Sequence, residues 1–446
     1  MAKAKKSNKI LWRIHNWTGL YVGIVIGILS LTGALAVFIP EIESWIHLNN
    51  LQVTAVRKNK APVSPVLHQL KNQFHDDRLL AIYPPASEGK PMEFDFYSFK
   101  SRTDSKRTKV FVDPGTGKII HHVDHLNSVP NYLRQVHVRL MDGFYGRQLV
   151  GLAGIGLVVI SITGLLIYGD FMKKQFFGVI RHGKNMRILF ADWHKLVGIV
   201  ALVFNLMIAF TGAWLGLQPR LMKWTGMEIP NAYLRDEKPL TPEEDERFEF
   251  DYYLALEKSQ QAIDNFIPVM VTPSSDGSAT LEIRGDLKGN IYEPHINKVV
   301  LDKGSLDVLF QYDISKQNFW HRLYFIQEGL HFGRFAGIGV KIAYFLLGLT
   351  SGFLSISGFV IYLKRKEKKN GSRLNAGKTV FLYSMGTVAV LILLGLATTL
   401  IGYNYVTMII TPLVYLFLIA FIGYQTYRKV IKNKRDRDKT KKWEYA

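Results

Sequence analysis

The sequence contains no cysteine among its 446 residues. This absence excludes disulfide bonds, cysteine-ligated iron–sulfur clusters, zinc ribbons and thioether-linked haem, so any redox centre must use other ligands. Acidic residues are also few, 36 against 56 lysines and arginines, and the formal net charge is +20. The basic residues flank apolar segments and do not cover one face of a soluble domain, so nucleic acid is not an expected partner.

Long apolar segments are frequent, and 48% of the residues are hydrophobic. A helix needs about 20 apolar residues to cross the hydrocarbon of a bilayer. Six segments meet this requirement: 17–39, 148–169, 196–217, 336–362, 378–401 and 405–427. The first segment is too long for the core of a cleavable signal peptide, so we expect it to remain as an anchor.

Lysine and arginine cluster on one side of the predicted spans. If every span crosses, this side is cytoplasmic by the positive-inside rule, and both termini are cytoplasmic. In a bacterial cell of the Gram-negative type this orientation places the protein in the inner membrane, with the other side in the periplasm. The predicted organisation is an N-terminus and first span (1–39), outer segments (40–147 and 218–335), spans two and three with their loop (148–217), a fourth span (336–362), a basic loop (363–377), a two-span hairpin (378–427) and a basic tail (428–446).

The two outer segments alternate polar and apolar residues, as β-strands do. The alternating runs are 92–97, 109–112, 280–283 and 297–301, and turn residues follow at 113–117 and 302–304. We therefore predict a membrane all-α helical bundle of six spans with two extracytoplasmic α+β domains.

A duplication relates the first span to the third and the second to the fourth. The first pair shares histidine, glycine and Thr-Gly-Ala at identical spacing: His15, Gly19, Thr32-Gly33-Ala34, and His194, Gly198, Thr211-Gly212-Ala213. The second pair shares a Ser-Ile-x-Gly motif: Ser161-Ile162-Thr163-Gly164 and Ser355-Ile356-Ser357-Gly358. The same register places His137 opposite His331. The core is therefore an internally duplicated four-helix bundle, and the last two spans are additional.

Four of the 13 histidines lie at the predicted membrane faces and follow the duplication: His15 and His194 inside, His137 and His331 outside. Haem iron held by two neutral imidazoles is six-coordinate and suited to passing single electrons. One haem cannot bridge about 30 Å of hydrocarbon. We therefore predict two b-type haems, one near each face, each with one ligand from each copy. Histidines that only anchor a helix at headgroup depth are the alternative.

Glycines and cations near these histidines fit the same prediction. Gly19 and Gly198 lie four positions after the inner histidines, on the same helical face, where a missing side chain would let a porphyrin approach. Haem propionates need cations, and ordinary snorkelling to the headgroups is the other explanation for cations here. The candidates are Arg13 and Lys195 inside, and Arg147 and Arg334 outside.

The outer pair raises a problem of length. A continuous helix from His137 to Tyr168 would run roughly 47 Å at about 1.5 Å per residue, longer than the bilayer core. Either Gly143 and Gly146 break the helix and fold His137 back, or another residue serves, with His321 as the reserve candidate. A further group, His121, His122 and His125 with Asp124, resembles a metal patch, and a solvated loop is the favoured interpretation.

These residues resemble the PepSY-associated transmembrane proteins, which include inner-membrane ferric-siderophore reductases that bind two haems. The resemblance covers residues 8–366. It is carried by Arg13-Ile14-His15 with Gly19 and Thr32-Gly33, Trp193-His194 with Gly198, Leu330-His331-Phe332-Gly333, and Val110 to Lys118. It implies two periplasmic PepSY modules above a four-helix haem core. The second module departs from the motif, with Leu301-Asp302-Lys303-Gly304-Ser305-Leu306.

The resemblance also implies an oxidoreductase that moves electrons outward to a ferric siderophore or another periplasmic ferric chelate. No nucleotide or flavin motif is present, so the donor is expected to be a cytoplasmic reductase or a membrane quinol. No catalytic residue is assigned. The alternative function is a non-enzymatic, membrane-anchored PepSY protein that binds or regulates a periplasmic partner. A transporter is disfavoured because no unpaired charge lies in the middle of a span.

Overall fold

The structure is a computed structural model. It describes residues 2–47, 51, 53, 61–101, 104–172, 177–182, 185–233, 250–273, 279–370, 375–421, 424 and 427, and the predicted tail at 428–446 lies outside these residues. Within this part of the chain, six helices have the length and composition to cross a membrane: 9–36, 143–169, 202–225, 337–368, 377–401 and 403–421. The prediction of a multi-pass membrane protein is confirmed.

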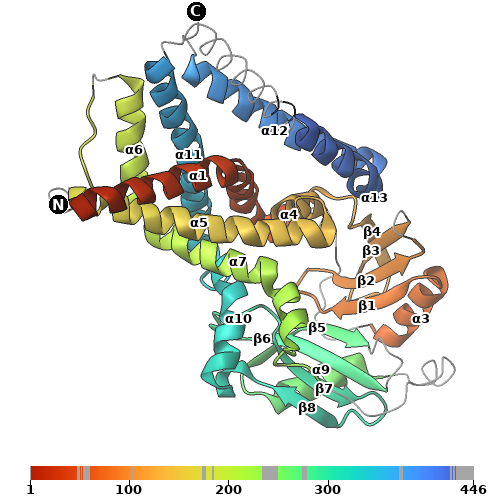
Figure 1. The fold of residues 1–446 in the computed structure, drawn as a ribbon. Helices are drawn as coiled ribbons and strands as arrows, with labels where there is room; N and C mark the ends of the chain where they lie inside the picture. The colour runs from red at the N-terminus through yellow and green to blue at the C-terminus, as the bar shows by residue number, and fades with distance from the viewer. Residues whose placement is uncertain are drawn as a thin grey trace, which may run out of the picture.

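Four long helices pack into the central bundle: α1 (Ala2–Ala36), α5 (Gly143–Met172), α7 (Leu202–Thr225) and α11 (Gly337–Asn370). Small residues allow close approach, since a Cβ on Gly154 would lie 2.7 Å from the backbone of Ala213. The second copy is bent where α1 is continuous. Its histidine-bearing helix α6 (Met186–Val200) ends at Ala201, where α7 begins in a new direction (Figure 1).

The strands of both outer segments form one antiparallel sheet at one end of the bundle (Figure 1), in the order β4-β3-β2-β1-β5-β6-β7-β8. The strands are β1 (Arg78–Tyr83), β2 (Met92–Phe99), β3 (Ser105–Val112), β4 (Ile119–Asp124), β5 (Phe266–Pro273), β6 (Thr280–Leu287), β7 (Asn297–Asp302) and β8 (Val308–Tyr312). The two halves meet where Ile82 pairs with Val271. The predicted segments therefore share one sheet.

One hydrophobic core serves both halves of the sheet. It contains Phe94 and Phe96 from the first half and Leu281 and Ile283 from the second. Helices α3 (Val63–Gln73) and α9 (Tyr252–Ala262) contribute their apolar faces to it. Alternation along β2 buries Phe94 in this core and directs Glu93 to the other face of the sheet, toward the bundle side.

The two predicted strand turns have the same geometry although their sequences differ. Asp113 accepts hydrogen bonds from Gly115 N, and Asp302 accepts the equivalent bond from Gly304 N. The turn closes at Gly117 with φ +71° and at Leu306 with φ +57°. The left-handed backbone is therefore kept in the second copy without glycine, at a modest conformational cost.

Two short helices carry the outer histidines. Helix α4 (Val129–Arg139) precedes α5, and α10 (Phe319–Phe332) precedes α11. Between α4 and α5 the backbone is left-handed at Leu140, Met141 and Gly143, and a Cβ on Gly146 would lie 1.7 Å from Arg139 O. The structure therefore contains the predicted break at Gly143 and Gly146, which folds α4 back onto the bundle.

The remaining elements connect the sheet and the bundle. Helix α2 (Ile39–His47) follows α1, and η1 (Ile314–Lys316) precedes α10. Helix α12 (Ala376–Ile401) leaves the far end of α11 and returns to the sheet end, where α13 (Tyr403–Tyr405) and the π-helix η2 (Val406–Ile410) lie near α4 (Figure 1).

Candidate functional site: two histidine pairs in the bundle

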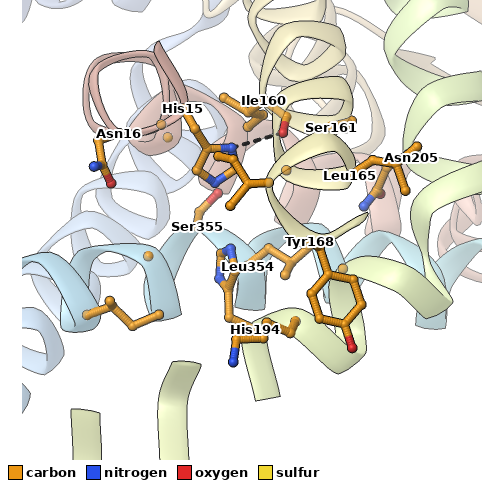
Figure 2. A pocket seen from close by; sticks show the side chains of 18 of the residues that line it. His15, Asn16, Ile160, Ser161, Leu165, Tyr168, His194, Asn205, Leu354 and Ser355 are labelled. Carbon is orange, nitrogen blue, oxygen red and sulfur yellow. Dashed lines mark hydrogen bonds between the residues drawn. The ribbon is translucent and has the colours of Figure 1, made fainter. Parts of the chain in front are cut away.

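The structure brings His15 and His194 together at the end of the bundle away from the sheet. Their ring centroids are 6.4 Å apart and their planes make an angle of 87°. Both rings line a mainly apolar cavity of about 250 Å³ (Figure 2). Gly19 and Gly198 line the same cavity, and a Cβ on Gly19 would meet no atom within 4 Å. The two glycines therefore leave room beside the histidine pair.

The structure also pairs His137 with His331, at the end of the bundle that meets the sheet. Their centroids are 6.0 Å apart and their planes make an angle of 34°. They line a cavity of about 610 Å³ that extends from the bundle to Tyr97 and Arg107 of the sheet. Burial lowers the pKa of His137 to about 4 and that of His331 to about 3, so both rings are neutral, as metal ligation requires.

Each of the four rings makes its hydrogen bonds through Nδ1, to a hydroxyl on a neighbouring helix. The Nδ1–Oγ distances are 3.1 Å for His15 and Thr163, 2.7 Å for His194 and Ser357, 3.4 Å for His137 and Thr32, and 2.9 Å for His331 and Thr211. Backbone carbonyls add to this in the first copy, with Ile160 O 3.1 Å from His15 Nδ1 (Figure 2) and Leu29 O 3.0 Å from His137 Nδ1.

These hydroxyls fix the tautomer of the rings. Each hydroxyl donates its own hydrogen to a carbonyl in the preceding turn of its helix, as Thr211 does to Met207 O at 2.8 Å and Ser357 to Leu354 O at 3.0 Å. The oxygen then accepts from the imidazole, so Nδ1 carries the proton and Nε2 carries the lone pair. A metal-binding histidine needs this arrangement of the second nitrogen.

A glycine follows each hydroxyl and lies under the ring that the hydroxyl binds. The distance from an added Cβ to the ring Cε1 is 2.5 Å for Gly33 and His137, 3.2 Å for Gly164 and His15, 3.2 Å for Gly212 and His331, and 3.8 Å for Gly358 and His194. Each histidine ring therefore has its own Thr-Gly or Ser-Gly dipeptide, whose hydroxyl binds Nδ1 and whose glycine leaves space under Cε1. We call each such dipeptide a glycine cradle.

The residues fit the predicted haem. Two imidazoles on opposite sides of one metal ion, with metal–nitrogen bonds of about 2 Å, place their ring centroids roughly 6 Å apart. Both observed separations, 6.4 Å and 6.0 Å, agree with this value. Each pair would offer two imidazole Nε2 atoms, with every Nδ1 already hydrogen-bonded, which is a donor set that suits a b-type haem.

The family model described as the PepSY-associated TM region matches residues 12–365, which include all four histidines. The chain belongs to the PepSY-associated transmembrane family. A Pseudomonas aeruginosa protein, uncharacterized protein PA4219, is 25% identical over 291 residues, which are 59% of this chain and 71% of that protein. Its name assigns no activity.

Two of the four cations expected in this PepSY-associated protein, Lys195 and Arg147, line the cavities, and Arg13 and Arg334 do not. Lys195 lines the inner cavity with Arg365, whose guanidinium lies 5.3 Å from the Trp12 ring centroid. Arg13 is exposed and, among the described residues, is not part of the cavity lining. Arg365 lies near the end of α11, in the segment predicted as a basic loop, and its position one turn beyond the predicted span could have identified it from the sequence.

At the outer cavity, Arg147 is part of the lining, and its Nε and Nη2 donate to Leu215 O at 3.0 and 2.7 Å. Arg334 lies 4.9 Å from the ring centroid of its neighbour Phe332, outside the described lining. Arg134 and Arg139 line the cavity instead. Both lie within one helical turn of His137, so their spacing from that histidine could have identified them from the sequence as cations near the outer pair.

The remaining histidines lie away from the two pairs. His321 Nδ1 lies 3.2 Å from the hydroxyl of Tyr312 and stacks on its ring, so the reserve candidate is placed against β8. His121 and His122 are exposed on β4, an edge strand, and not on the expected loop. Among the described residues, no group of three histidine or acidic side chains has the arrangement of a metal site.

Proposed function

We propose that this protein carries electrons across a bacterial inner membrane through two b-type haems and reduces a periplasmic ferric siderophore or a similar ferric chelate. The observation that carries the proposal is the set of four histidines in two facing pairs at opposite ends of the bundle, each held by its own hydroxyl and glycine. The orientation proposed is the sheet outside and both termini in the cytoplasm, by the charge distribution around the spans.

The adjacency of the two cavities supports an electron path. Ile26, Leu157 and Ser351 line both cavities, so the inner and the outer cavity share a wall of side chains. Electrons would enter from a cytoplasmic reductase or a membrane quinol at the inner pair and leave at the outer pair, under the sheet.

The chemistry at the outer end follows from the ligand set. Haem supplies a one-electron carrier when it is bound. His137 and His331 would hold the outer group from two sides, so the chain would leave no open metal position for the acceptor. Arg134 and Arg139 supply positive charge at this cavity, suited to propionates and to an anionic ferric chelate. Reduction releases the metal because ferrous iron binds hard oxygen chelators less tightly.

The test is a reduced-minus-oxidised visible spectrum with haem quantification. We expect two haems per chain in the wild type, and one in each of the variants H15A/H194A and H137A/H331A. The matched control H122A, exposed on β4, should retain both, and H321A should also retain both. A colourless wild-type protein, or two haems in the quadruple variant, would reject the proposal and favour a non-enzymatic PepSY protein.

A further inference from the structure

The last two spans pack on α4, the helix that carries His137. Gly395 of α12 lies against Tyr132 of α4, where an added Cβ would be 3.0 Å from Tyr132 Cε1, and the Tyr132 hydroxyl donates to Leu391 O. Val136, next to His137, shares a buried cluster with Val406 of η2. The side of this contact that belongs to the last two spans lies beyond residue 365, outside the match to the family.

Hydrogen bonds from the same spans hold both ends of α4. Before the helix, Asn127 Oδ1 accepts from Tyr403 N at 2.8 Å. After it, Leu140 O accepts from the Tyr415 hydroxyl at 2.7 Å. Leu140 lies in the left-handed cap that folds α4 back, so Tyr415 satisfies a carbonyl that the helix itself leaves without an intrahelical donor.

The turn between the two spans is fixed to the sheet. Asn404 Nδ2 donates to Ser105 O at 2.9 Å, and the Ser105 hydroxyl donates to Asn404 Oδ1 at 3.0 Å. Tyr403 beside it lines the outer cavity. The two spans therefore connect β3, α4 and the outer cavity wall.

The second copy holds its outer histidine without such help. In α10, Gly329 packs on the backbone of the outer segment, where a Cβ would lie 1.9 Å from Ile291 O, and Leu330 O accepts from the Tyr344 hydroxyl of α11 at 2.8 Å. The duplication places Gln135 and Val150 at the positions of Gly329 and Tyr344. Neither residue can make the equivalent contact, so α4, which also packs on α1 and α5, lacks these two contacts of α10 within its own copy.

We infer that the hairpin of the last two spans, residues 376–421, is the positioning element for the outer ligand His137, and that Gly395 and Tyr415 are its main positioning residues. The hairpin replaces, for the first copy, the contacts that α10 receives from its own repeat. The inference rests on the proposed function for its redox consequence, and on the contacts above for its mechanical part.

The experiment compares full-length Gly395→Leu with the matched variant Gly386→Leu. Both glycines lie in α12, but a Cβ on Gly386 would meet no atom within 4 Å. We expect Gly395→Leu to weaken binding at the outer haem by about 10-fold or more, as for loss of other ligand-orienting contacts, and to leave the inner haem unchanged. Gly386→Leu should match the wild type. Tyr415→Phe, which keeps the shape of the ring, should shift the spectrum of the outer haem alone.

Hydrogen exchange gives a second measurement that does not need haem. The amides of α4 should exchange faster in Gly395→Leu, while those of α10 keep the wild-type rate. The inference is overturned if α4 exchange and the outer haem are unchanged in both Gly395→Leu and Tyr415→Phe, or if both haems change equally. A wild-type protein without haem would reject the proposed function, and the α4 exchange would still decide the mechanical part.

Discussion

Ser351 donates a hydrogen bond to Asn205 Oδ1 across 2.6 Å, inside the wall that separates the two cavities. Both side chains are buried. The duplication places Ile26 and Leu157 at the equivalent positions of the first copy, and these two also belong to the wall. The partition between the histidine pairs is therefore polar where it comes from one copy and apolar where it comes from the other.

This relationship predicts opposite outcomes for single and double replacements. Ser351→Ala leaves a buried amide oxygen without its donor, which costs about 1–3 kcal/mol in soluble proteins and about 0.6 kcal/mol on average between membrane helices. We expect Ser351→Ala to lower the thermal stability of the purified protein, and Asn205→Ile with Ser351→Leu, the pair found in the first copy, to restore most of it. If the thermal stability lost in the double variant equals the sum of the losses in Asn205→Ile and in Ser351→Leu, this prediction is contradicted.

The hydroxyl partners of the imidazoles predict haem affinity. Thr163→Val and Thr211→Val keep the side-chain shape but remove a hydroxyl that accepts from Nδ1 of His15 and of His331, respectively. His15 keeps Ile160 O as a second acceptor, so the effect at the inner pair should be the smaller one. Loss of such an orienting partner typically weakens metal binding 10–100-fold. We expect Thr163→Val to release the inner haem faster, and Thr211→Val the outer haem, to a haem-scavenging protein. Thr350→Val is the control, because that hydroxyl bonds only within its own helix, to Leu347 O.

The glycine cradles predict a more severe effect at one position. A Cβ at position 33 would lie 2.5 Å from Cε1 of His137, closer than real contacts allow, so Gly33→Ala must displace the ring. We expect one haem per chain in this variant, with the inner haem kept. Gly27→Ala, on the same helix, meets Ser355 Cβ at an ordinary 3.8 Å and should keep two. Two haems with unchanged spectra in Gly33→Ala would show that His137 is not a ligand.

The ring angles predict two different electron paramagnetic resonance signals. Nearly perpendicular imidazole planes give the strongly anisotropic low-spin ferric signal, and more nearly parallel planes give the rhombic one. The inner planes make an angle of 87° and the outer planes 34°. We expect one signal of each type, with the anisotropic one lost in H15A/H194A and the rhombic one lost in H137A/H331A. A single shared signal type would contradict the ring geometry.

The sequence predicted the spans and the four histidines because both leave local, repeated patterns. It did not predict the shared sheet, since the edge pairing of Ile82 with Val271 joins positions far apart in the chain and has no local signature. The Thr-Gly dipeptides were visible as repeats, but their role depends on which ring faces them. That depends on the turn after α4, where Gly143 and Gly146 indicated a break but the left-handed backbone at Leu140 and Met141 has no local sequence signature.

The docking of α2 on the sheet predicts a pH dependence. Lys109 Nζ lies 2.7 Å from the carboxylate of Glu43, and His125 Nδ1 lies 3.5 Å from it. Burial alone would raise the pKa of Glu43, but the hydrogen bonds and charges of His125 and Lys109 outweigh it and hold the pKa at about 2. A lowered carboxyl pKa stabilises the fold above the unfolded value of 4.5, and this contribution is lost as the pH falls toward 2.

We therefore expect Glu43→Gln to lower the free energy of unfolding at pH 6 by about 1–3 kcal/mol. Each unit of pKa shift corresponds to about 1.4 kcal/mol, and partial hydration of the site reduces the effect. At pH 3 the difference from the wild type should shrink, because the wild-type protein has by then lost part of the same contribution. The exposed Glu88→Gln serves as the control and should follow the wild type at both pH values. An equal loss in Glu43→Gln at pH 6 and pH 3 would mean that the side chain acts through packing and not through its charge.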